Sequence, residues 1–406
     1  MKIVYHHRTA SRDGQSTHIE EMIRALRHVG CEVEEAAPSV VDTSQVGGSA
    51  GWVGKLKLYL PRSLYELAEL GYSFVAYRRL SRKLREARPH GIYERYNLYL
   101  LAGVWAKKRH RLPLVLEVNA PMALERRQYG GLSWPRLADW AERYVWMRAD
   151  IVLPVSRVLA NHIIAQGVSA ERVVVLHNGV DEDHYKNLMS TEEAKQALGL
   201  RGKLVIGFTG FVREWDRLDR IVAWLACQSS ATNAHLLVVG DGPARMEIEA
   251  CAAKLNVSDR VSFTGAVPRE RVPSLAMAFD IALQTALVPY ASPLCLFEYL
   301  ALGKAVVAPD QPNHHEVLED QVDSILYSTE SDRGIENALD ALVSDATLRE
   351  RIASRAPDTI RRKHLTWKQN AQTVDALFRR LSGDDWTDAP THATAARVAG
   401  GQPPLS

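Results

Sequence analysis

The sequence predicts an α/β protein made of two doubly wound domains, each built around a parallel sheet. Short runs of β-branched and other apolar residues alternate with helical stretches along most of the chain, which is the pattern of βα units. The 406 residues suffice for two domains of ordinary size. Hydrophobic residues make up 46% and charged residues 24% of the chain, as in globular proteins with a sizeable core.

Composition also excludes several classes of function. The net charge of +2 is too small to indicate nucleic acid as a partner. No CxxC pair occurs, which argues against a zinc site and favours a reducing, cytoplasmic compartment; the cysteines are Cys31, Cys227, Cys251 and Cys295. The start, MKIVYHHRTA, is typical of a strand rather than a signal peptide, and no apolar run approaches the roughly 20 residues of a membrane span.

The first domain is expected to open with a strand, a loop and a helix. Residues 2–7 read as a buried strand, and the loop 8–16 contains Gly14. A helix is predicted to start near Thr17, which has Glu20 at capping-box spacing. Ligands bind at such strand ends in doubly wound sheets. The glycine patterns GxGxxG and GxxxxGK(S/T) are both absent, so neither a dinucleotide site nor a P-loop is predicted.

A long basic segment interrupts the strands of the first domain. Further strands are predicted at 32–37, 92–96, 114–119, 151–155 and 173–177. Between the first two, a Gly/Ser-rich loop at 47–54 leads into 55–88, where Lys and Arg residues are interleaved with leucines. This segment is either the solvated face of a helix or an amphipathic helix that lies on an anionic membrane surface. The second interpretation would place the protein peripherally at the inner face of the membrane.

The second domain is expected to follow a linker at 182–190. Ser190 and Glu193 have capping-box spacing for a short helix. A strand is then predicted at 204–210, and 235–245 reads as a strand, a glycine turn and the start of a helix. Further strands are predicted at 281–286 and 305–309, while 334–362 reads as helical. A last amphipathic helix at 367–381 precedes a segment, 383–406, that is rich in Thr, Ala, Gly and Pro and is predicted to be disordered.

One helix of the second domain carries a polar residue in an apolar setting. Ser292 is a suitable N-cap and Pro293 a suitable first residue, and an apolar face follows. Glu298 lies near the middle of this helix. The free N–H groups at the helix start suit a phosphate, and the carboxylate suits sugar hydroxyls, so the helix could seat a nucleotide diphosphate with its ribose. The alternative is an ordinary packed helix with a solvated glutamate.

The segment SPLCLFEYLALGKAVVAPD resembles the donor-site segment SPxKLFEY of retaining glycosyltransferases of family four, which have the GT-B fold. Other segments match in the expected order, so the resemblance extends from the start to about residue 381. It implies two Rossmann-like domains that face each other across a cleft. Residues 1–182, with a returning helix at about 366–381, would bind the acceptor, and residues 190–365 would bind the donor.

The resemblance also implies the substrates. The donor would be a UDP- or GDP-sugar and the acceptor a glycan or a lipid-linked molecule, in the synthesis of surface polysaccharide or glycoconjugate. Enzymes of this kind need no metal or other cofactor to hold the diphosphate. The acidic triplet at 181–183 is therefore interpreted as a polar linker rather than as a metal-binding DxD motif.

Three groups of site residues follow from the resemblance, and each is read from its position in this sequence. The residues expected to act in catalysis are Arg213, Arg217 and Glu298. The residues expected at the donor, besides Glu298, are Gly14, Gly210, Gly240, Gly242, Val267, Tyr290, Ser292, Pro293 and Leu294. The residues expected at the acceptor are His18, Glu94, Arg95, Glu117 and Asn119.

The chain departs from the family pattern at three positions. Tyr290 stands where many relatives have a first glutamate, Cys295 where the subgroup has a lysine, and Asn119 lies where many relatives have a histidine. The alignment of Arg213 and Arg217 with the family is also open. Relatives have a lysine in this loop, and an alignment through Trp215 puts Asp216 rather than Arg217 at its position. The departures at Tyr290, Cys295 and Asn119 motivate one alternative, a non-catalytic subunit that binds sugar nucleotides. A second alternative is another GT-B enzyme, such as a sugar-nucleotide epimerase.

Overall fold

The computed structural model describes residues 1–9, 14–38, 61–229 and 232–383. The predicted loop at 47–54, the start of the basic segment and, apart from Gly383, the predicted disordered segment lie outside these residues. The chain forms two compact units. Unit 1 contains residues 1–178, 290–292 and the chain from 367 onward, and unit 2 contains residues 179–289 and 293–366.

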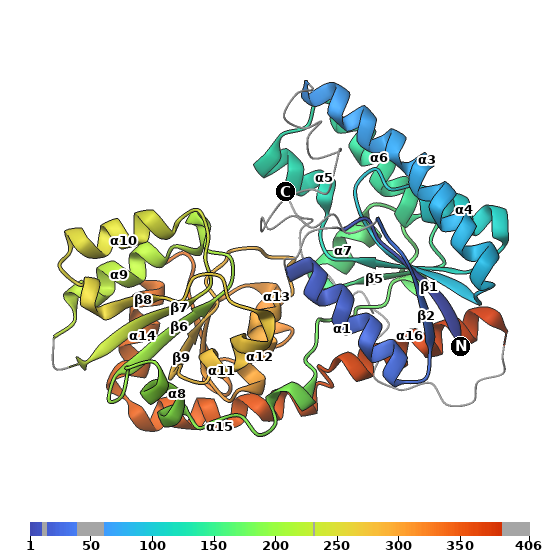
Figure 1. Cartoon of the computed structure of the whole chain (residues 1–406). Helices are drawn as coiled ribbons and strands as arrows, with labels where there is room; N and C mark the ends of the chain where they lie inside the picture. The colour runs from blue at the N-terminus through green and yellow to red at the C-terminus, as the bar shows by residue number, and fades with distance from the viewer. Residues whose placement is uncertain (10–13, 39–60, 230–231, 384–406) are drawn as a thin grey trace. The chain divides into compact units, whose positions relative to one another are not determined.

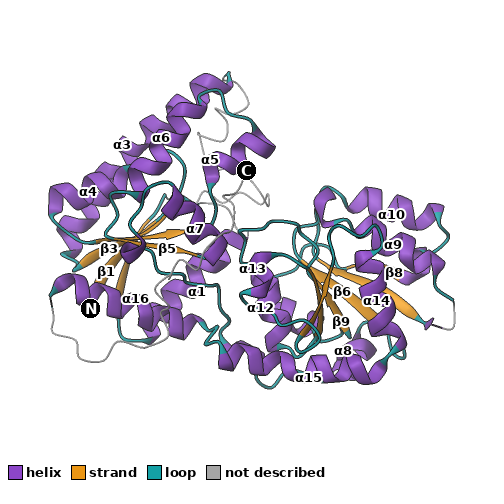
Figure 2. Ribbon diagram, turned by 180° about the vertical axis from the view of Figure 1, so that it is seen from behind, coloured by secondary structure: helices purple, strands orange, loops and turns teal. Residues whose placement is uncertain are grey.

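Unit 1 is built on a parallel sheet of five strands in the order β2-β1-β3-β4-β5. Val4 of β1 pairs with Glu34 on one side and with Ile92 on the other, and helices cover both faces of the sheet, as Figures 1 and 2 show. The strands are β1 (Lys2–His6), β2 (Glu32–Ala36), β3 (Gly91–Arg95), β4 (Leu114–Val118) and β5 (Ile151–Pro154).

The helices of unit 1 lie on the two faces of this sheet, with α1 packed against α16 on one of them. The apolar side of α16 is buried, and the ring of Phe378 lies so close to Gly91 that a Cβ there would collide with it. The helices are α1 (Gly14–His28), α3 (Arg62–Ala87), α4 (Ala102–His110), α5 (Met122–Glu125), α6 (Pro135–Trp146), α7 (Arg157–Ala165) and α16 (Trp367–Ser382).

Two local predictions for unit 1 were wrong. Helix α1 already includes Gly14, so Thr17 lies inside the helix and is not its cap. The segment 173–177 is not a strand of the sheet, although Val173 forms an isolated bridge with Val152. The N–H groups of Val174 and Leu176 donate to β5, but a regular ladder would need a return bond from residue 154, and Pro154 has no N–H.

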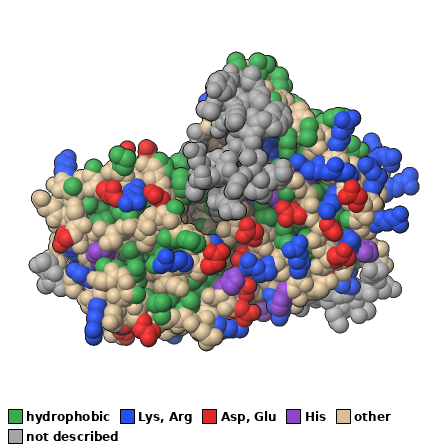
Figure 3. All heavy atoms as spheres, in the orientation of Figure 1, with side chains coloured by type: hydrophobic (Ala, Val, Ile, Leu, Met, Phe, Trp, Pro, Cys, Tyr) green, Lys and Arg blue, Asp and Glu red, His purple; other side chains and the backbone are tan. Residues whose placement is uncertain are grey.

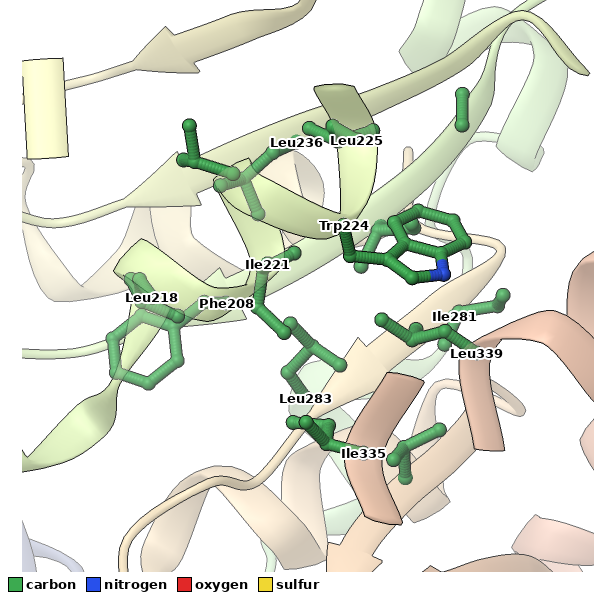
Figure 4. Close-up of a cluster of buried hydrophobic side chains, with 14 of the residues drawn as sticks. Phe208, Leu218, Ile221, Trp224, Leu225, Leu236, Ile281, Leu283, Ile335 and Leu339 are labelled. Atoms are coloured by element: carbon green, nitrogen blue, oxygen red, sulfur yellow. The ribbon is translucent and has the colours of Figure 1, made fainter. Parts of the chain in front are cut away.

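Unit 2 has a parallel sheet of six strands in the order β11-β10-β9-β6-β7-β8. Its core lies on both faces of the sheet, and Figure 4 shows side chains of α9 and α14 that point toward the strands. The strands are β6 (Leu204–Thr209), β7 (Ala234–Val239), β8 (Val261–Phe263), β9 (Ile281–Leu283), β10 (Ala305–Pro309) and β11 (Ser324–Tyr327).

One helix of unit 2 begins as predicted, and one predicted helical segment is divided into two helices. Ser190 and Glu193 form the expected capping box at the start of α8. The helical segment at 334–362 is broken at Asp345, whose carboxylate caps the second helix by accepting from the N–H of Leu348. The helices are α8 (Thr191–Ala197), α9 (Leu218–Cys227), α10 (Arg245–Lys254), α11 (Val272–Ala276), α12 (Leu294–Ala301), α13 (Pro312–His315), α14 (Gly334–Ser344) and α15 (Ala346–Arg362).

Candidate functional site

The loops that follow β6, β7 and β8 lie together in unit 2, because parallel strands end at the same edge of their sheet. The N–H of Gly210 donates to the carbonyl of Val239 at 3.1 Å, and the N–H of Gly240 donates to Oγ1 of Thr264 at 3.2 Å. Three segments that are far apart in the sequence are thereby joined, and the predicted donor residues Gly210, Gly240 and Gly242 all belong to them.

Gly240 and Gly242 are required by close approach of two backbones. Gly240 has a φ of +148°, and a Cβ there would collide with the carbonyl oxygen of Gly210. A Cβ at Gly242 would collide with the backbone of Val212. The glycine pattern at this turn therefore reflects the packing of the β7 loop against the β6 loop.

The loop after β6 holds Arg213 in place through its backbone. The N–H of Arg213 donates to Oδ2 of Asp216 at 2.8 Å, and burial raises the pKa of the Asp216 carboxyl to about 6. The guanidinium of Arg213 lies between two exposed rings, 5.2 Å from the centre of Phe211 and 4.9 Å from that of Trp215. Its side chain is thus on the surface, where a phosphate can reach it.

Arg217 occupies a different position from Arg213. It has a φ of +50° and precedes the first residue of α9, and its exposed guanidinium lies 3.6 Å from the carboxylate of Asp219. Asp216 lies between the two arginines in the sequence and is buried, so the loop presents two surface guanidinium groups around one buried carboxyl.

Helix α12 begins at Leu294, and its start differs from the prediction. Ser292 is not its N-cap: Pro293 is the cap residue, and Oγ of Ser292 instead accepts from the N–H of Asn178 at 3.1 Å. The helix is fixed to the end of β6 by Tyr299, whose hydroxyl bonds with both the N–H and Oγ1 of Thr209 at 2.8 and 2.9 Å. This bond places the helix at the same edge of the sheet as the three loops.

Glu298 is buried in α12 and forms an ion pair with Arg269, a residue that the sequence did not single out. Arg269 follows Val267, one of the residues expected at the donor, by two positions in the loop after β8. One turn before Glu298, Sγ of Cys295 donates to Oε1 of Gln284 at 3.2 Å. Burial first, and then the charges of Glu298 and Asp216, raise the pKa of the Cys295 thiol to about 12, so this thiol is not a nucleophile.

The tripeptide before α12 belongs to unit 1. The carbonyl of Tyr290 accepts from Oγ of Ser156 at 2.8 Å, and the carbonyl of Ser292 accepts from Nδ2 of Asn178 at 2.5 Å. The side chain of Tyr290 is buried. Two of the predicted donor residues therefore have their polar backbone groups engaged with α7 and the chain at Asn178.

In unit 1, four of the predicted acceptor residues form one buried cluster around Glu117. The carboxylate accepts from Arg95 and from Asn119, both at 2.5 Å, and from two strand tyrosines, Tyr93 at 2.9 Å and Tyr5 at 3.2 Å. Burial alone would raise the pKa of Glu117, but these donors and nearby charges hold that pKa below its ordinary value. The two tyrosines were missed, because within a buried strand nothing distinguishes a packed tyrosine from one that donates.

His18 joins the same cluster from α1. Its Nδ1 accepts from Arg95 at 3.0 Å and lies 3.4 Å from the carboxylate of Glu117, and its ring meets that of Trp367 edge to face. Burial lowers the pKa of His18 to about 4, with the charge of Arg95 acting in the same direction. His18 is therefore neutral at neutral pH and is enclosed by its neighbours.

Glu94 is separate from this cluster and is fully buried. One carboxylate oxygen lies 2.5 Å from Nδ1 of His6, and the other, within the described residues, accepts no hydrogen bond. Gly103 allows the carboxylate this position, because a Cβ there would collide with it. The structure thus places Glu94 inside the unit, away from any surface that could contact an acceptor directly.

A second buried acidic group in unit 1 was not predicted. Glu69 of α3 is bound by Arg126 through two bonds of 2.5 and 3.0 Å, and also by Arg8. Burial would raise the pKa of Glu69, but the two guanidinium groups hold it below its ordinary value. Arg8 lies just after the carboxyl end of β1, the edge of the sheet where ligands bind in such folds, and Arg126 comes after α5, the helix that follows β4.

Two family models match the chain. One, described as a glycosyl transferase 4-like domain, matches residues 13–179, and the other, described as glycosyl transferases group 1, matches residues 190–359. Among curated proteins, the 2-deoxystreptamine glucosyltransferase of Streptomyces kanamyceticus is 32% identical over 36% of this chain and 39% of its own length. The D-inositol 3-phosphate glycosyltransferase of Nocardia farcinica is 26% identical over 98% of this chain and 87% of its own length.

Solved structures match over a larger share of the chain. The structure of HepE from Anabaena in complex with UDP has a TM-score of 0.72 at 20% identity, and the match covers 94% of this chain and 100% of HepE. The sucrose-phosphate synthase of Thermosynechococcus elongatus also has a TM-score of 0.72, at 15% identity, over 94% of this chain and 99% of that one.

Proposed function

Because its two matched domains and its fold make this chain a GT-B glycosyltransferase, we propose that it moves a sugar from a nucleotide-sugar donor to a glycan or lipid-linked acceptor, with retention of the anomeric configuration. The GT-B fold predicted from the sequence is confirmed by the two parallel-sheet units and by their structural neighbours. The reaction, the acceptor and the stereochemistry are the proposal.

The observation that carries the proposal is Glu298 on α12, at the edge of the sheet where the loops after β6 and β7 also end. The start of α12 offers free N–H groups and partial positive charge to a diphosphate. Arg213 offers an exposed guanidinium, which binds phosphate oxygens in pairs. Glu298 accepts the ribose hydroxyls. HepE has been solved with UDP and with UDP-glucose, which supports a nucleotide-sugar donor.

Catalysis in this proposal is electrostatic. The bond from the anomeric carbon to the diphosphate breaks as negative charge grows on the leaving phosphate, and Arg213, Arg217 and the α12 start stabilise that charge. The acceptor hydroxyl then attacks from the face that the diphosphate leaves, and its proton passes to an oxygen of the departing phosphate. These groups supply the positive charge from the protein itself, so we expect transfer to proceed without a metal and to continue in EDTA.

The acceptor is proposed to bind in unit 1, as a polyhydroxylated molecule. The curated relatives support this chemistry, since their names include 2-deoxystreptamine and inositol 3-phosphate as acceptors. The chain spans only 39% of the length of the 2-deoxystreptamine glucosyltransferase, so 2-deoxystreptamine serves here only as a test compound. A role in surface polysaccharide or glycoconjugate synthesis remains part of the proposal.

Helix α3 supports a peripheral contact with a membrane at the cytoplasmic face. Leu64 and Leu67 are 50% and 44% exposed, and Trp134, which donates from Nε1 to the carbonyl of Ser63, is exposed beside them. Basic side chains gather over α3 and α4, as Figure 3 shows. This combination suits an anionic lipid surface. No helix within the described ranges is both long and apolar enough to cross a bilayer.

The proposal is tested by activity with a panel of UDP-, GDP-, ADP- and dTDP-sugars, each combined with cyclitol, glycan and lipid-linked acceptors. Nucleotide release that depends on the acceptor, and a product whose anomeric configuration by NMR equals that of the donor, would support it. Turnover of a sugar nucleotide without any acceptor would indicate an epimerase instead. Binding without turnover across the panel would indicate a non-catalytic subunit.

Arg213→Ala provides the matched test of the site. We expect kcat/KM to fall by about tenfold or more, because one charge-assisted hydrogen bond is worth roughly 1.5–3 kcal/mol. The melting temperature should stay within about 1 °C, because Asp216 holds the loop through the backbone of Arg213 and not through its side chain. Arg201→Ala, an exposed arginine in the same unit, is the control. Unchanged kcat/KM in Arg213→Ala would exclude Arg213 from the site.

A further inference from the structure

Arg269 and Glu298 form an ion pair between two segments that meet in unit 2. Nη2 of Arg269 contacts Oε1 of Glu298, and the side chain of Glu298 is 7% exposed whereas that of Arg269 is 40% exposed. Arg269 begins a short 3-10 turn that follows the loop after β8. A buried carboxylate of α12 is thus held from outside by a guanidinium that is itself partly in solvent.

Arg269 supplies positive charge to a part of α12 that lacks the lysine of the family motif. Relatives with the SPxKLFEY motif have a lysine at position 295, and here the thiol of Cys295 is influenced by two carboxyl groups, those of Glu298 and Asp216. The side chains of the other nearby arginines are placed elsewhere. Arg213 lies over two aromatic rings, and Arg217 lies near Asp219. Within the described residues, Arg269 is the cation found on Glu298.

Only one of the two carboxylate oxygens of Glu298 is occupied by this contact. An ionised carboxylate has about four acceptor positions on its two oxygens. Arg269 takes a position on Oε1, so this contact leaves further acceptor positions of the carboxylate to other donors. A guanidinium on one side fixes the rotation of the carboxylate, so the other oxygen stays oriented to accept from hydroxyl groups of a ligand.

We propose that Arg269 is a positioning residue for ribose recognition: it orients Glu298 so that the carboxylate accepts the vicinal hydroxyls of the donor nucleotide. This inference rests on the proposed function, because it assumes that a nucleotide binds beside α12. Arg269 acts through Glu298, and its loss should reduce the selectivity for ribose over 2′-deoxyribose rather than the binding of the diphosphate.

The experiment measures nucleotide affinity by isothermal titration with UDP, 2′-deoxy-UDP, GDP and 2′-deoxy-GDP on the full chain. For whichever base the wild type binds, we expect the ribose form to bind about tenfold or more tightly than the 2′-deoxy form, since the site's acceptor for the hydroxyl is then left unpaired. In Arg269→Ala, affinity for the ribose form should fall toward that of the 2′-deoxy form, while affinity for the 2′-deoxy form stays nearly the same.

Two further variants separate positioning from a general loss of charge or fold. Arg269→Lys keeps a cation and should recover part of the selectivity. Arg271→Ala removes an exposed arginine two residues later in the same turn and should leave the selectivity unchanged. The melting temperatures of all variants are compared with that of the wild type, and Arg269 is sufficiently exposed for its loss to be tolerated.

The outcomes are distinguishable. If Arg269→Ala keeps the wild-type ratio of ribose to 2′-deoxyribose affinity, the inference is wrong and the proposed function is unaffected. Equal loss of affinity for both forms would also overturn it, since Arg269 would then contribute general charge to the diphosphate. A wild type that binds none of the four nucleotides would refute UDP and GDP as the nucleotides of the proposed donor, which is a failure of the proposed function and not of the role of Arg269.

Discussion

Cys295 is the residue at which this chain differs most sharply from the motif that it resembles. Its thiol lies near two carboxyl groups, Asp216 and Glu298, and its pKa is raised, so it supplies neither charge nor nucleophile. A donor that carries a diphosphate would meet one positive charge fewer at this turn of α12 than in relatives with a lysine. The arginines of the neighbouring loops would have to compensate.

Cys295→Lys tests that account. We expect the KM for the donor to fall by about tenfold, because a lysine ammonium adds one charge-assisted hydrogen bond to the diphosphate, worth roughly 1.5–3 kcal/mol. Steady-state kinetics with varied donor measures it. Cys295→Ser, which removes the thiol without adding charge, should behave like the wild type. A lysine variant with an unchanged KM would show that the charge at position 295 does not act on the donor.

The stability of unit 1 should depend on pH through one buried carboxyl group, that of Glu142. Its carboxyl group accepts from the hydroxyl of Tyr96 at 2.8 Å and from the N–H of Ala123 at 3.2 Å, and burial raises its pKa to about 7 from an ordinary 4.5. The folded chain therefore keeps a proton on Glu142 at pH values where the unfolded chain has lost it. The stabilisation is complete below about pH 4.5 and is lost as the pH rises through 7.

Glu142→Gln should remove this slope. Relative to the wild type, the free energy of unfolding of the variant should increase as the pH rises from 5 to 8, because glutamine has no proton to lose. Urea denaturation at several pH values measures the difference between the two proteins, in which the titration of other groups such as His18 cancels. A difference that is the same at every pH would mean that Glu142 is ionised throughout.

At the scale of elements, α3 shows why the sequence could not assign a buried face. The helix buries Glu66, Glu69 and Ser73 and exposes Leu64 and Leu67, which reverses the usual assignment of charge to solvent. The acids are buried because distant groups satisfy them: the N–H groups of residues 133 and 134 bind Glu66, and two arginines bind Glu69. Those partners are remote in sequence, so no local periodicity indicates them.

In the candidate site, too, partners that are remote in sequence could not be predicted from local patterns. The glycine turns and Glu298 could be predicted because a local motif carries them, and the structure places them at one edge of the sheet of unit 2. The partner of Glu298 could not, since Arg269 is 29 residues away and its sequence context, VPRERV, is that of a surface turn. In unit 1, the cluster around Glu117 depends on side chains from β1, β3 and α1 that only the tertiary fold brings together.

The apolar surface of α3 makes a testable prediction about membranes. The wild type should sediment with vesicles that contain anionic lipid and not with purely zwitterionic vesicles. The double variant Leu64→Ser/Leu67→Ser should lose most of this binding, because both side chains are exposed on the helix. Leu255→Ser, an exposed leucine of unit 2, is the control. Equal sedimentation of the double variant and the wild type would exclude α3 as the contact.

At the scale of the whole molecule, the fold class could be predicted because alternating strands and helices constrain the sheets so strongly. Parallel strands buried on both faces read as apolar runs, and the helices between them are long enough to recognise. The prediction of a strand at 173–177 was wrong because Pro154 in the neighbouring strand has no N–H to donate. This effect depends on which strands are paired.

Each unit has buried side chains of its own, which predicts how the chain melts. Calorimetry should resolve two transitions, of which Leu80→Ala lowers one and Leu225→Ala lowers the other, because these fully buried leucines belong to units 1 and 2. A bound donor nucleotide should raise only the transition that Leu225→Ala lowers, since ligands stabilise the unit that binds them. A nucleotide that raised only the other transition would move the proposed donor site to unit 1.

The three residues 290–292 bear on how this protein could be recombined with its relatives. They are part of unit 1 by their contacts, held by Ser156 and Asn178, although the chain on either side of them belongs to unit 2. A chimera that grafts a foreign donor domain as one continuous block would import a foreign tripeptide into the host's hydrogen bonds. Engineered hybrids should therefore retain the host residues at these three positions inside the transplanted block.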